Sequence, residues 1–273
     1  MKDHGARVLI PVGIHACNPG PMTGAGNWTW LIEGRVPTLI DAGTGDPRHL
    51  QALDEALRGA RLAQVLVTHG HSDHASGAPA IAGRESSGRF HKMPWPERDE
   101  RVAVAWTPIA DGDVLEAGDT SLVAVHTPGH APDHLCFWHQ ETRTVFCGDL
   151  AIQGTTVWIP ATGRGEMADY VASLERILSL NPARMMPAHG AVIEDPVPLL
   201  RQYIEHRLRR EQQVLEALRR GDSSVDAIVG RIYRALQDKL VPFARDSVTA
   251  HLQKLEREGR ARSAAGAWHI IEP

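Results

Sequence analysis

The chain has 273 residues, of which 42% are apolar, and its formal net charge is −4 at pH 7. These values allow one sizeable hydrophobic core plus an appendage, and they exclude a strong overall preference for polyanions. No window reaches the apolar length of a membrane span, and the first residues do not resemble a signal peptide. The three cysteines show no paired spacing, so we expect a reduced, cytoplasmic protein that contacts no membrane.

Short apolar runs between Gly and Pro turns predict the first strands, at 7–14, 28–34 and 37–43. PRHLQALDEALRG predicts a helix that begins near Pro47 and ends at Gly59. An apolar strand at 63–69 follows, and small residues at 73–82 predict a further helix. The polar segment 84–100 contains two prolines and predicts a surface insertion, which could cap a cleft.

A second strand-rich stretch predicts strands at 102–106, 120–130, 134–140 and 144–150. A helix at 166–180 and a short strand at 183–189 complete a body of sheets covered by helices. From about Pro198 the pattern changes to helices at 199–220, 223–236 and 244–259, followed by a hairpin with Gly266 at its turn. This order is the winged-helix plan. We therefore predict a catalytic domain at 1–197, and a linker helix with a winged-helix domain at 198–273.

The segment THGHSDH at 68–74 comes directly after a predicted apolar strand. Because side chains alternate along an extended chain, we expect His69 and His71 to converge on one metal ion. Asp73 and His74, which turn into the next helix, can then face a second ion. Imidazole and carboxylate are ligands that zinc accepts and that iron or manganese also use, so the segment predicts a metal site.

Three further residues with metal-binding side chains, His130, Asp149 and His189, each end an apolar run that predicts a strand. A glycine stands next to each of them and permits the tight turn that presents a side chain at the end of a strand. Ligands gathered from several strand ends are typical of a site that a rigid scaffold positions.

The motif T-H-x-H-x-D-H, then a single His, a single Asp and a single His, with the earlier Asp41 in LIDAG, resembles the metallo-β-lactamase superfamily. The resemblance implies two ligand groups: His69, His71 and His130 on one metal ion, and Asp73, His74 and His189 on the other. It also implies that Asp149 bridges the ions and that Asp41 orients a ligand imidazole. His134, in GHAPDH, is expected to be structural or to support the ligands from outside.

The fold that the resemblance implies is an αβ/βα four-layer sandwich of the mixed α/β class, with the metals at one edge of two sheets. The activity is hydrolysis by a hydroxide held between two cations, because coordination lowers the pKa of water from about 16 to roughly 7. Asp149 and Asp73 are the expected catalytic residues, and Asp73 could exchange a proton. Two zinc ions are expected, with iron or manganese as other choices.

Within the superfamily, the chain resembles the β-lactamase-like protein 2 group, through NPGPMT, TPGHAPDHL, FCGDLAIQGTTV, PAHGAVI, YIEHRLRREQQVL and HLQKLEREGR. Members bind two zinc ions, and animal members are endoribonucleases, which implies a phosphodiesterase acting on single-stranded RNA. Phosphate contacts are then expected from Arg245, Lys254 and Arg257 in the basic tail, with the chemistry confined to the body. Trp28 replaces a polar residue of the group in a loop expected near the metals, so substrate contacts there can differ.

Two other functions stay open. A thioester hydrolase of the glyoxalase II type would use the same ligands, although the tail lacks that family's glutathione-binding cluster. A nucleic-acid-binding regulator with a structural metal site is the non-enzyme alternative, but structural zinc sites are closed and tetrahedral. A true β-lactamase does not use the bridging position of Asp149. Whether the winged helix binds nucleic acid or lines the cleft, the natural substrate, and the oligomeric state are left open by the residues.

Overall fold

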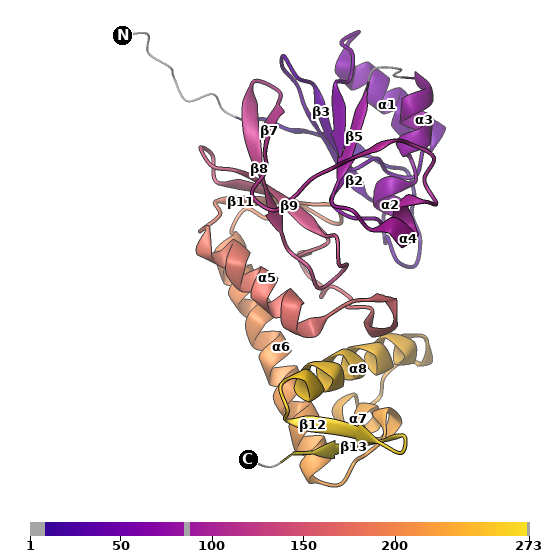
Figure 1. Ribbon diagram of the computed structural model, residues 1–273, viewed down its shortest axis with the longest axis vertical. Coiled ribbons are helices and arrows are strands. Elements are labelled where there is room, and N and C mark those ends of the chain that lie inside the picture. Colours follow the sequence, from indigo (N-terminus) through magenta and orange to yellow (C-terminus); the bar gives the residue numbers. More distant parts are fainter. Residues whose placement is uncertain (1–8, 85–87, 272–273) are drawn as a thin grey trace.

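The computed structural model describes residues 9–84 and 88–271. Two mixed sheets pack face to face, and helices cover the outer face of each, while a small helical domain lies at the far end of one long helix (Figure 1). The predicted four-layer α/β sandwich followed by a winged-helix domain is confirmed. In the described part of the chain, no helix is long and apolar enough to cross a membrane.

The first sheet has six strands, in chain order across the sheet: β1 (Val12–His15), β2 (Trp28–Ile32), β3 (Thr38–Ile40), β4 (Gln64–Leu66), β5 (Arg89–Lys92) and β6 (Trp106–Pro108). The first three pair antiparallel, and β3 to β6 pair parallel. The second sheet has the order β11-β10-β9-β8-β7, from β7 (Val114–Ala117), β8 (Thr120–His126), β9 (Leu135–His139), β10 (Thr144–Gly148) and β11 (Arg184–Pro187). In it only β10 and β11 are parallel.

Three apolar clusters hold the layers together. Between the sheets, Ile40 and Leu66 of the first sheet pack with Phe137 and Phe146 of the second. Outside the first sheet lie α1 (Pro47–Leu57) and α3 (Ala78–Arg84), and outside the second lie α5 (Met167–Ser179) and the first half of α6 (Pro196–Arg219). Burial of this apolar surface at about 25 cal/mol per Å² is the main term that favours the sandwich.

The helix α6 runs out of the body into the tail, and its two halves serve different cores (Figure 1). Leu200 and Tyr203 pack in the cluster of the second sheet, whereas Val214 and Leu218 pack in the core of the tail. The tail continues with α7 (Val225–Ile232), a 3-10 turn η2 (Asp238–Leu240), α8 (Val241–Arg257) and the hairpin β12 (Ala261–Ala264) and β13 (Ala267–Ile270). We propose that the boundary between the two domains lies within α6.

The expectation of a surface insertion at 84–100 is wrong, apart from residues 85–87, which lie outside the described residues. This segment forms β5, inside the first sheet, and the short helix α4 (Pro96–Asp99). The polar composition led to a wrong prediction because Lys92 is buried against two carboxylates. Its Nζ lies 2.6 Å from Oδ1 of Asp99 and 2.9 Å from Oδ2 of Asp133. Long polar side chains that find partners can occupy a central strand.

Several predicted elements differ in extent, three of them near the first sheet. The helix expected at 73–82 is two helices, α2 (Ser72–Ala75) and α3, which part at Gly77, where a Cβ would lie 2.1 Å from the Ala42 carbonyl oxygen. The strand expected at 7–14 begins at Val12, and its residues 7 and 8 lie outside the described residues. The strand expected at 102–106 begins only at Trp106.

Candidate metal centre

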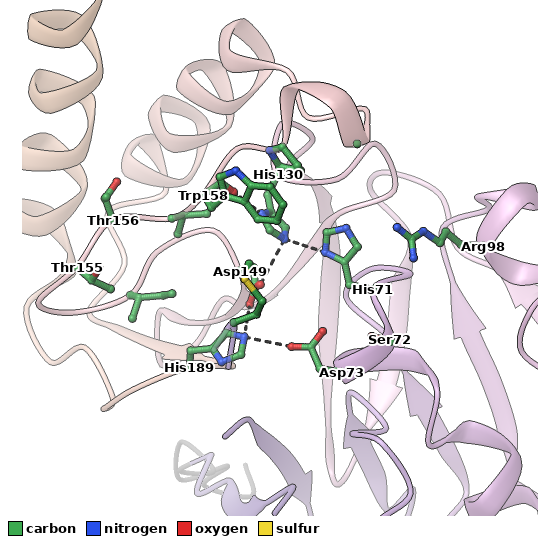
Figure 2. Close-up of a pocket in the computed structure, with 15 residues that line it drawn as sticks. His71, Ser72, Asp73, Arg98, His130, Asp149, Thr155, Thr156, Trp158 and His189 are labelled. Atoms are coloured by element: carbon green, nitrogen blue, oxygen red, sulfur yellow. Dashed lines mark hydrogen bonds and ion pairs between the residues drawn. The ribbon is translucent and has the colours of Figure 1, made fainter. Parts of the chain in front are cut away.

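All the predicted ligands lie at one edge of the two sheets, in the segments that follow the carboxyl ends of strands. His69 and His71 follow β4, and Asp73 and His74 belong to α2 directly beyond. The others are His130 after β8, Asp149 after β10 and His189 after β11. Figure 2 shows His71, Asp73, His130, Asp149 and His189 directed toward one another from these loops.

His130 does not end its strand, contrary to expectation. The strand β8 ends at His126, and the chain turns through Gly129 before it reaches His130. Gly129 has φ of 130°, and a Cβ there would lie 2.3 Å from the Cα of Tyr170. The close approach to α5 therefore requires glycine, and it sets the point at which His130 enters the site.

Three imidazoles form the first candidate ligand group. The Nδ1 atom of His71 lies 2.9 Å from Nε2 of His69 and 3.0 Å from Nε2 of His130. Ligand atoms around a tetrahedral zinc ion with bonds of 2.0–2.1 Å are separated by about 3.3 Å, so these nitrogens need only small shifts to hold one ion. Burial is the main cause that lowers the pKa of His69 well below its usual value and that of His71 to about 3. Neutral imidazole is the form that binds a metal.

The second group combines one carboxylate and two imidazoles. Oδ2 of Asp73 lies 3.5 Å from Nε2 of His74 and 3.4 Å from Nε2 of His189. Burial opposes a charge on His189, but Asp149 raises its pKa to about 9, and carboxylates likewise raise the pKa of His74 well above the usual value. The carboxylates therefore favour positive charge at this place, whether a proton or a metal ion carries it.

Asp149 stands between the two groups. Its Oδ2 lies 3.3 Å from Nε2 of His130, while its Oδ1 lies 3.4 Å from Nε2 of His74 and 3.3 Å from Nε2 of His189. Oδ1 is buried and makes no hydrogen bond within the described residues. Each oxygen of this buried carboxylate therefore faces the nitrogens of a different group, where a shared cation would lie, so the residues present fit two metal ions.

Asp41 and His134 contact the ligands from outside. Oδ2 of Asp41 lies 2.9 Å from Nδ1 of His74, and its Oδ1 accepts hydrogen bonds from the backbone N–H and the hydroxyl of Thr68. These bonds hold Asp41 in a left-handed conformation, with φ of 64°. Nε2 of His134 accepts the backbone N–H of Asp149 at 3.1 Å. Asp41 thus orients an imidazole and His134 orients the central carboxylate.

Two supporting residues were missed from the sequence. Nδ2 of Asn27 donates to Oδ2 of Asp73 at 2.9 Å, and Oδ2 of Asp133 accepts the backbone N–H of Gly70 at 2.8 Å. Both contacts join segments that are far apart in the chain, so no local sequence pattern predicts the supporting role of these two residues. The sequence predicted that Trp28 influences substrate contacts. In the structure Trp28 packs against Trp30 and does not line the cavity at the site.

A cavity of about 440 Å³ opens onto the centre. Arg98 lies on one side of it and Thr155 and Thr156 lie on the other, with Trp158 beside His130 (Figure 2). Arg98 comes from the 84–100 segment, which therefore does reach the cleft. The backbone carbonyl of Trp158 accepts a hydrogen bond from Nδ1 of His130 at 2.8 Å. The segment that carries Trp158 therefore forms part of the cavity wall and also orients His130, a predicted ligand.

The winged-helix domain contacts one residue of this wall, Trp158. Nε1 of Trp158 donates to Oδ2 of Asp246 in α8 at 2.7 Å, and its ring packs edge to face against Phe243 at 5.6 Å. A neighbouring cavity, of about 810 Å³, is lined by Trp158 and by residues of α8. The winged-helix domain thus packs behind a residue of the cavity wall, although none of its described residues lines the catalytic cavity itself.

The comparison with family models decides the relationship. The model of the metallo-β-lactamase superfamily matches residues 22–189, which include every predicted ligand. The chain belongs to the metallo-β-lactamase superfamily. A second model, the β-lactamase-associated winged-helix domain, matches residues 224–268. Superfamily members use metal ions for hydrolysis, so the prediction of a metal-dependent hydrolase is confirmed at this level, and the non-enzyme alternative is set aside.

Relatives of known sequence match nearly the whole chain. A β-lactamase-like protein 2 homologue of Drosophila melanogaster is 32% identical over 96% of this chain and 94% of its own, which confirms the predicted group. An atrochrysone carboxyl ACP thioesterase of Aspergillus fumigatus is also 32% identical, over 88% of this chain and 80% of its own.

Solved structures show the same fold. A β-lactamase domain protein of Burkholderia ambifaria superposes with a TM-score of 0.80 at 20% identity, and the match covers 96% of this chain and 91% of that one. A protein solved in a di-iron-bound form has a TM-score of 0.55 at 26% identity, over 71% of this chain and 98% of its own. The second structure shows that a relative of this metallo-β-lactamase fold takes iron.

Proposed function

We propose that this metallo-β-lactamase superfamily protein is a two-metal hydrolase that cleaves thioesters. The observation that carries the two-metal part is the placement of Asp149, whose two carboxylate oxygens each face a different ligand group. His69, His71 and His130 would hold one ion, and Asp73, His74 and His189 the other. Zinc suits this set of nitrogen and oxygen ligands, and iron or manganese would also fit.

When bound, two such ions supply a nucleophile from water near neutral pH and stabilise negative charge on the carbonyl oxygen. The side chains of the chain keep the ligands in place for this chemistry. Asp41 holds the imidazole of His74, and His134 holds the loop of Asp149 through its backbone. Burial opposes ionisation of Asp73, but the neighbouring imidazoles hold its pKa well below the usual value, so it remains a carboxylate that binds a cation or accepts a proton.

Two observations support a thioester as the substrate. Relatives that resemble this chain over most of its length are named ACP thioesterases. The cations expected to contact RNA are already paired with acids: Arg245 with Asp226, Lys254 with Glu211 and Glu258, and Arg257 with Glu166. Phosphates of RNA would have to displace these ion pairs.

Single-stranded RNA is the second candidate substrate. It is favoured by Arg207 and Arg210 of α6, which have no acidic partner among the described residues and line a cavity next to the catalytic one. A sequence-independent RNA contact would use such unpaired cations and would weaken as salt is added.

The protein loaded with zinc is expected to hydrolyse a small acyl thioester at least about 100-fold faster, by kcat/KM, than a chromogenic phosphodiester or a β-lactam. The physical reason is that the open cavity of about 440 Å³ leaves room beside the centre for a small acyl group. Release of free thiol, release of nitrophenolate and cleavage of a labelled RNA oligonucleotide are measured with one preparation. Cleavage of the RNA with no thioester hydrolysis would reverse the assignment.

A further inference from the structure

A second cavity adjoins the catalytic one on the side of α6. Its volume is about 420 Å³, and it shares Met22 and the segment 155–158 with the catalytic cavity. The remaining walls come from α6 and from the winged-helix domain: His206, Arg207, Arg210, Tyr233, Leu240 and Phe243. Because the same residues line both cavities, the second cavity lies next to any substrate whose scissile bond is held at the metal centre.

Two arginines of this cavity have no acidic partner in the described part of the chain. Arg207 is only 3% exposed, and it donates to the hydroxyl of Thr156 and to the carbonyl oxygen of Val157, while its Nε makes no hydrogen bond. The guanidinium of Arg210 lies 4.1 Å over the ring of Tyr233. Residues 9–84 and 88–271 offer Arg210 neither an ion pair nor a hydrogen bond, and its Nε is buried.

Two histidines lie beside these arginines. His206 lies on the same helix, and His251 of α8 is buried with neither ring nitrogen hydrogen-bonded to a described residue. Burial, and then the charges of the arginines, lower the pKa of both histidines. The arrangement differs from that of Arg245 and Arg257, which the protein pairs with its own acids. Positive charge in this cavity is left for a ligand to neutralise.

We propose that this basic cavity binds a phosphate group on the thiol-bearing arm of the substrate, while the acyl thioester lies at the metal centre. This assignment rests on the proposed thioesterase function. The planar guanidinium groups match the oxygens of a phosphate ester, and the free N–H groups of Arg210 provide the donors. Leu240 and Phe243 provide the apolar surface that an aliphatic arm between thioester and phosphate needs.

The test compares two substrates that differ by one phosphate, S-acetylpantetheine and S-acetyl-4′-phosphopantetheine, on the zinc-loaded full chain. We expect kcat/KM to be roughly tenfold or more higher for the phosphorylated substrate, mainly through KM. Arg210→Gln should abolish this preference, and Arg210→Lys, which keeps the charge, should retain part of it. Arg201→Gln, at an exposed position of the same helix, should retain all of it.

Calorimetric binding of 4′-phosphopantetheine and pantetheine to the same variants separates the phosphate site from the chemistry. Equal hydrolysis of both thioesters by the wild type would overturn the phosphate site and leave the thioesterase function standing. Hydrolysis of neither, together with tight binding of 4′-phosphopantetheine that requires Arg210, would overturn the function and support the site. In a third outcome, the wild type binds 4′-phosphopantetheine and pantetheine equally, and Arg210→Gln abolishes binding of a single-stranded RNA oligonucleotide. The assignment of a small phosphate ester to this cavity would then be wrong.

Discussion

Asp149→Ala is expected to lower kcat/KM by at least about 1000-fold on the substrate that the wild type hydrolyses best, or ~4 kcal/mol of transition-state stabilisation. The change removes the carboxylate that faces both ligand groups and lowers the pKa of His189, whose raised value depends on Asp149. Metal affinity at the second group should fall with it. Steady-state kinetics and metal analysis of the same preparation measure both effects.

Two controls accompany this variant. Asp149→Asn keeps the shape of the side chain without its charge and should be nearly as inactive, because a neutral amide does not balance two cations. Asp54→Ala, at an exposed position of α1, should retain full activity and full metal content. Turnover by Asp149→Ala within tenfold of the wild type would show that Asp149 does not bridge the centre.

Lys92→Met is expected to destabilise the body by about 3–5 kcal/mol, because it leaves the buried carboxylate of Asp133 without its cation. Both side chains are almost fully buried, and burial already raises the pKa of Asp133 with Lys92 in place. Urea unfolding followed by tryptophan fluorescence measures the loss as a lower midpoint.

The double variant Lys92→Met with Asp133→Asn is the matched control for this pair. It removes both charges, so much of the stability lost in Lys92→Met should return. Asp133 also accepts the backbone N–H of Gly70, between two ligand histidines, so the double variant should keep a weakened metal site. A loss of less than about 1 kcal/mol in Lys92→Met would contradict the account of a central strand stabilised by this ion pair.

The sequence predicted the residues that gather at the centre because the physical signal is local. Four ligands stand within the short segment His69–His74 after an apolar run, and the other three stand beside glycines that follow apolar runs. The distribution of Asp149 oxygens between two groups is a matter of side-chain orientation, which one sequence does not encode locally. Its bridging role is therefore a proposal built on the contacts in the structure.

Errors arose where contacts are long-range. The segment around Lys92 has the composition of a surface segment, yet the ion pairs of Lys92 with Asp99 and with Asp133, which is distant in the chain, allow it to form a buried strand. Arg245 and Arg257 have the charge that RNA binding needs, but the packing of α8 pairs them with Asp226 and Glu166. The sequence identifies the cationic side chains, whereas only the tertiary structure shows which of them have no acidic partner.

The metal content of the purified protein tests the central claim most directly. After saturation with zinc and removal of loosely bound ions, mass spectrometry should find close to two ions per chain. The same measurement on Asp149→Ala should find one or fewer, while Asp54→Ala should match the wild type. A wild-type protein that never retains more than one tightly bound ion would contradict the two-metal centre.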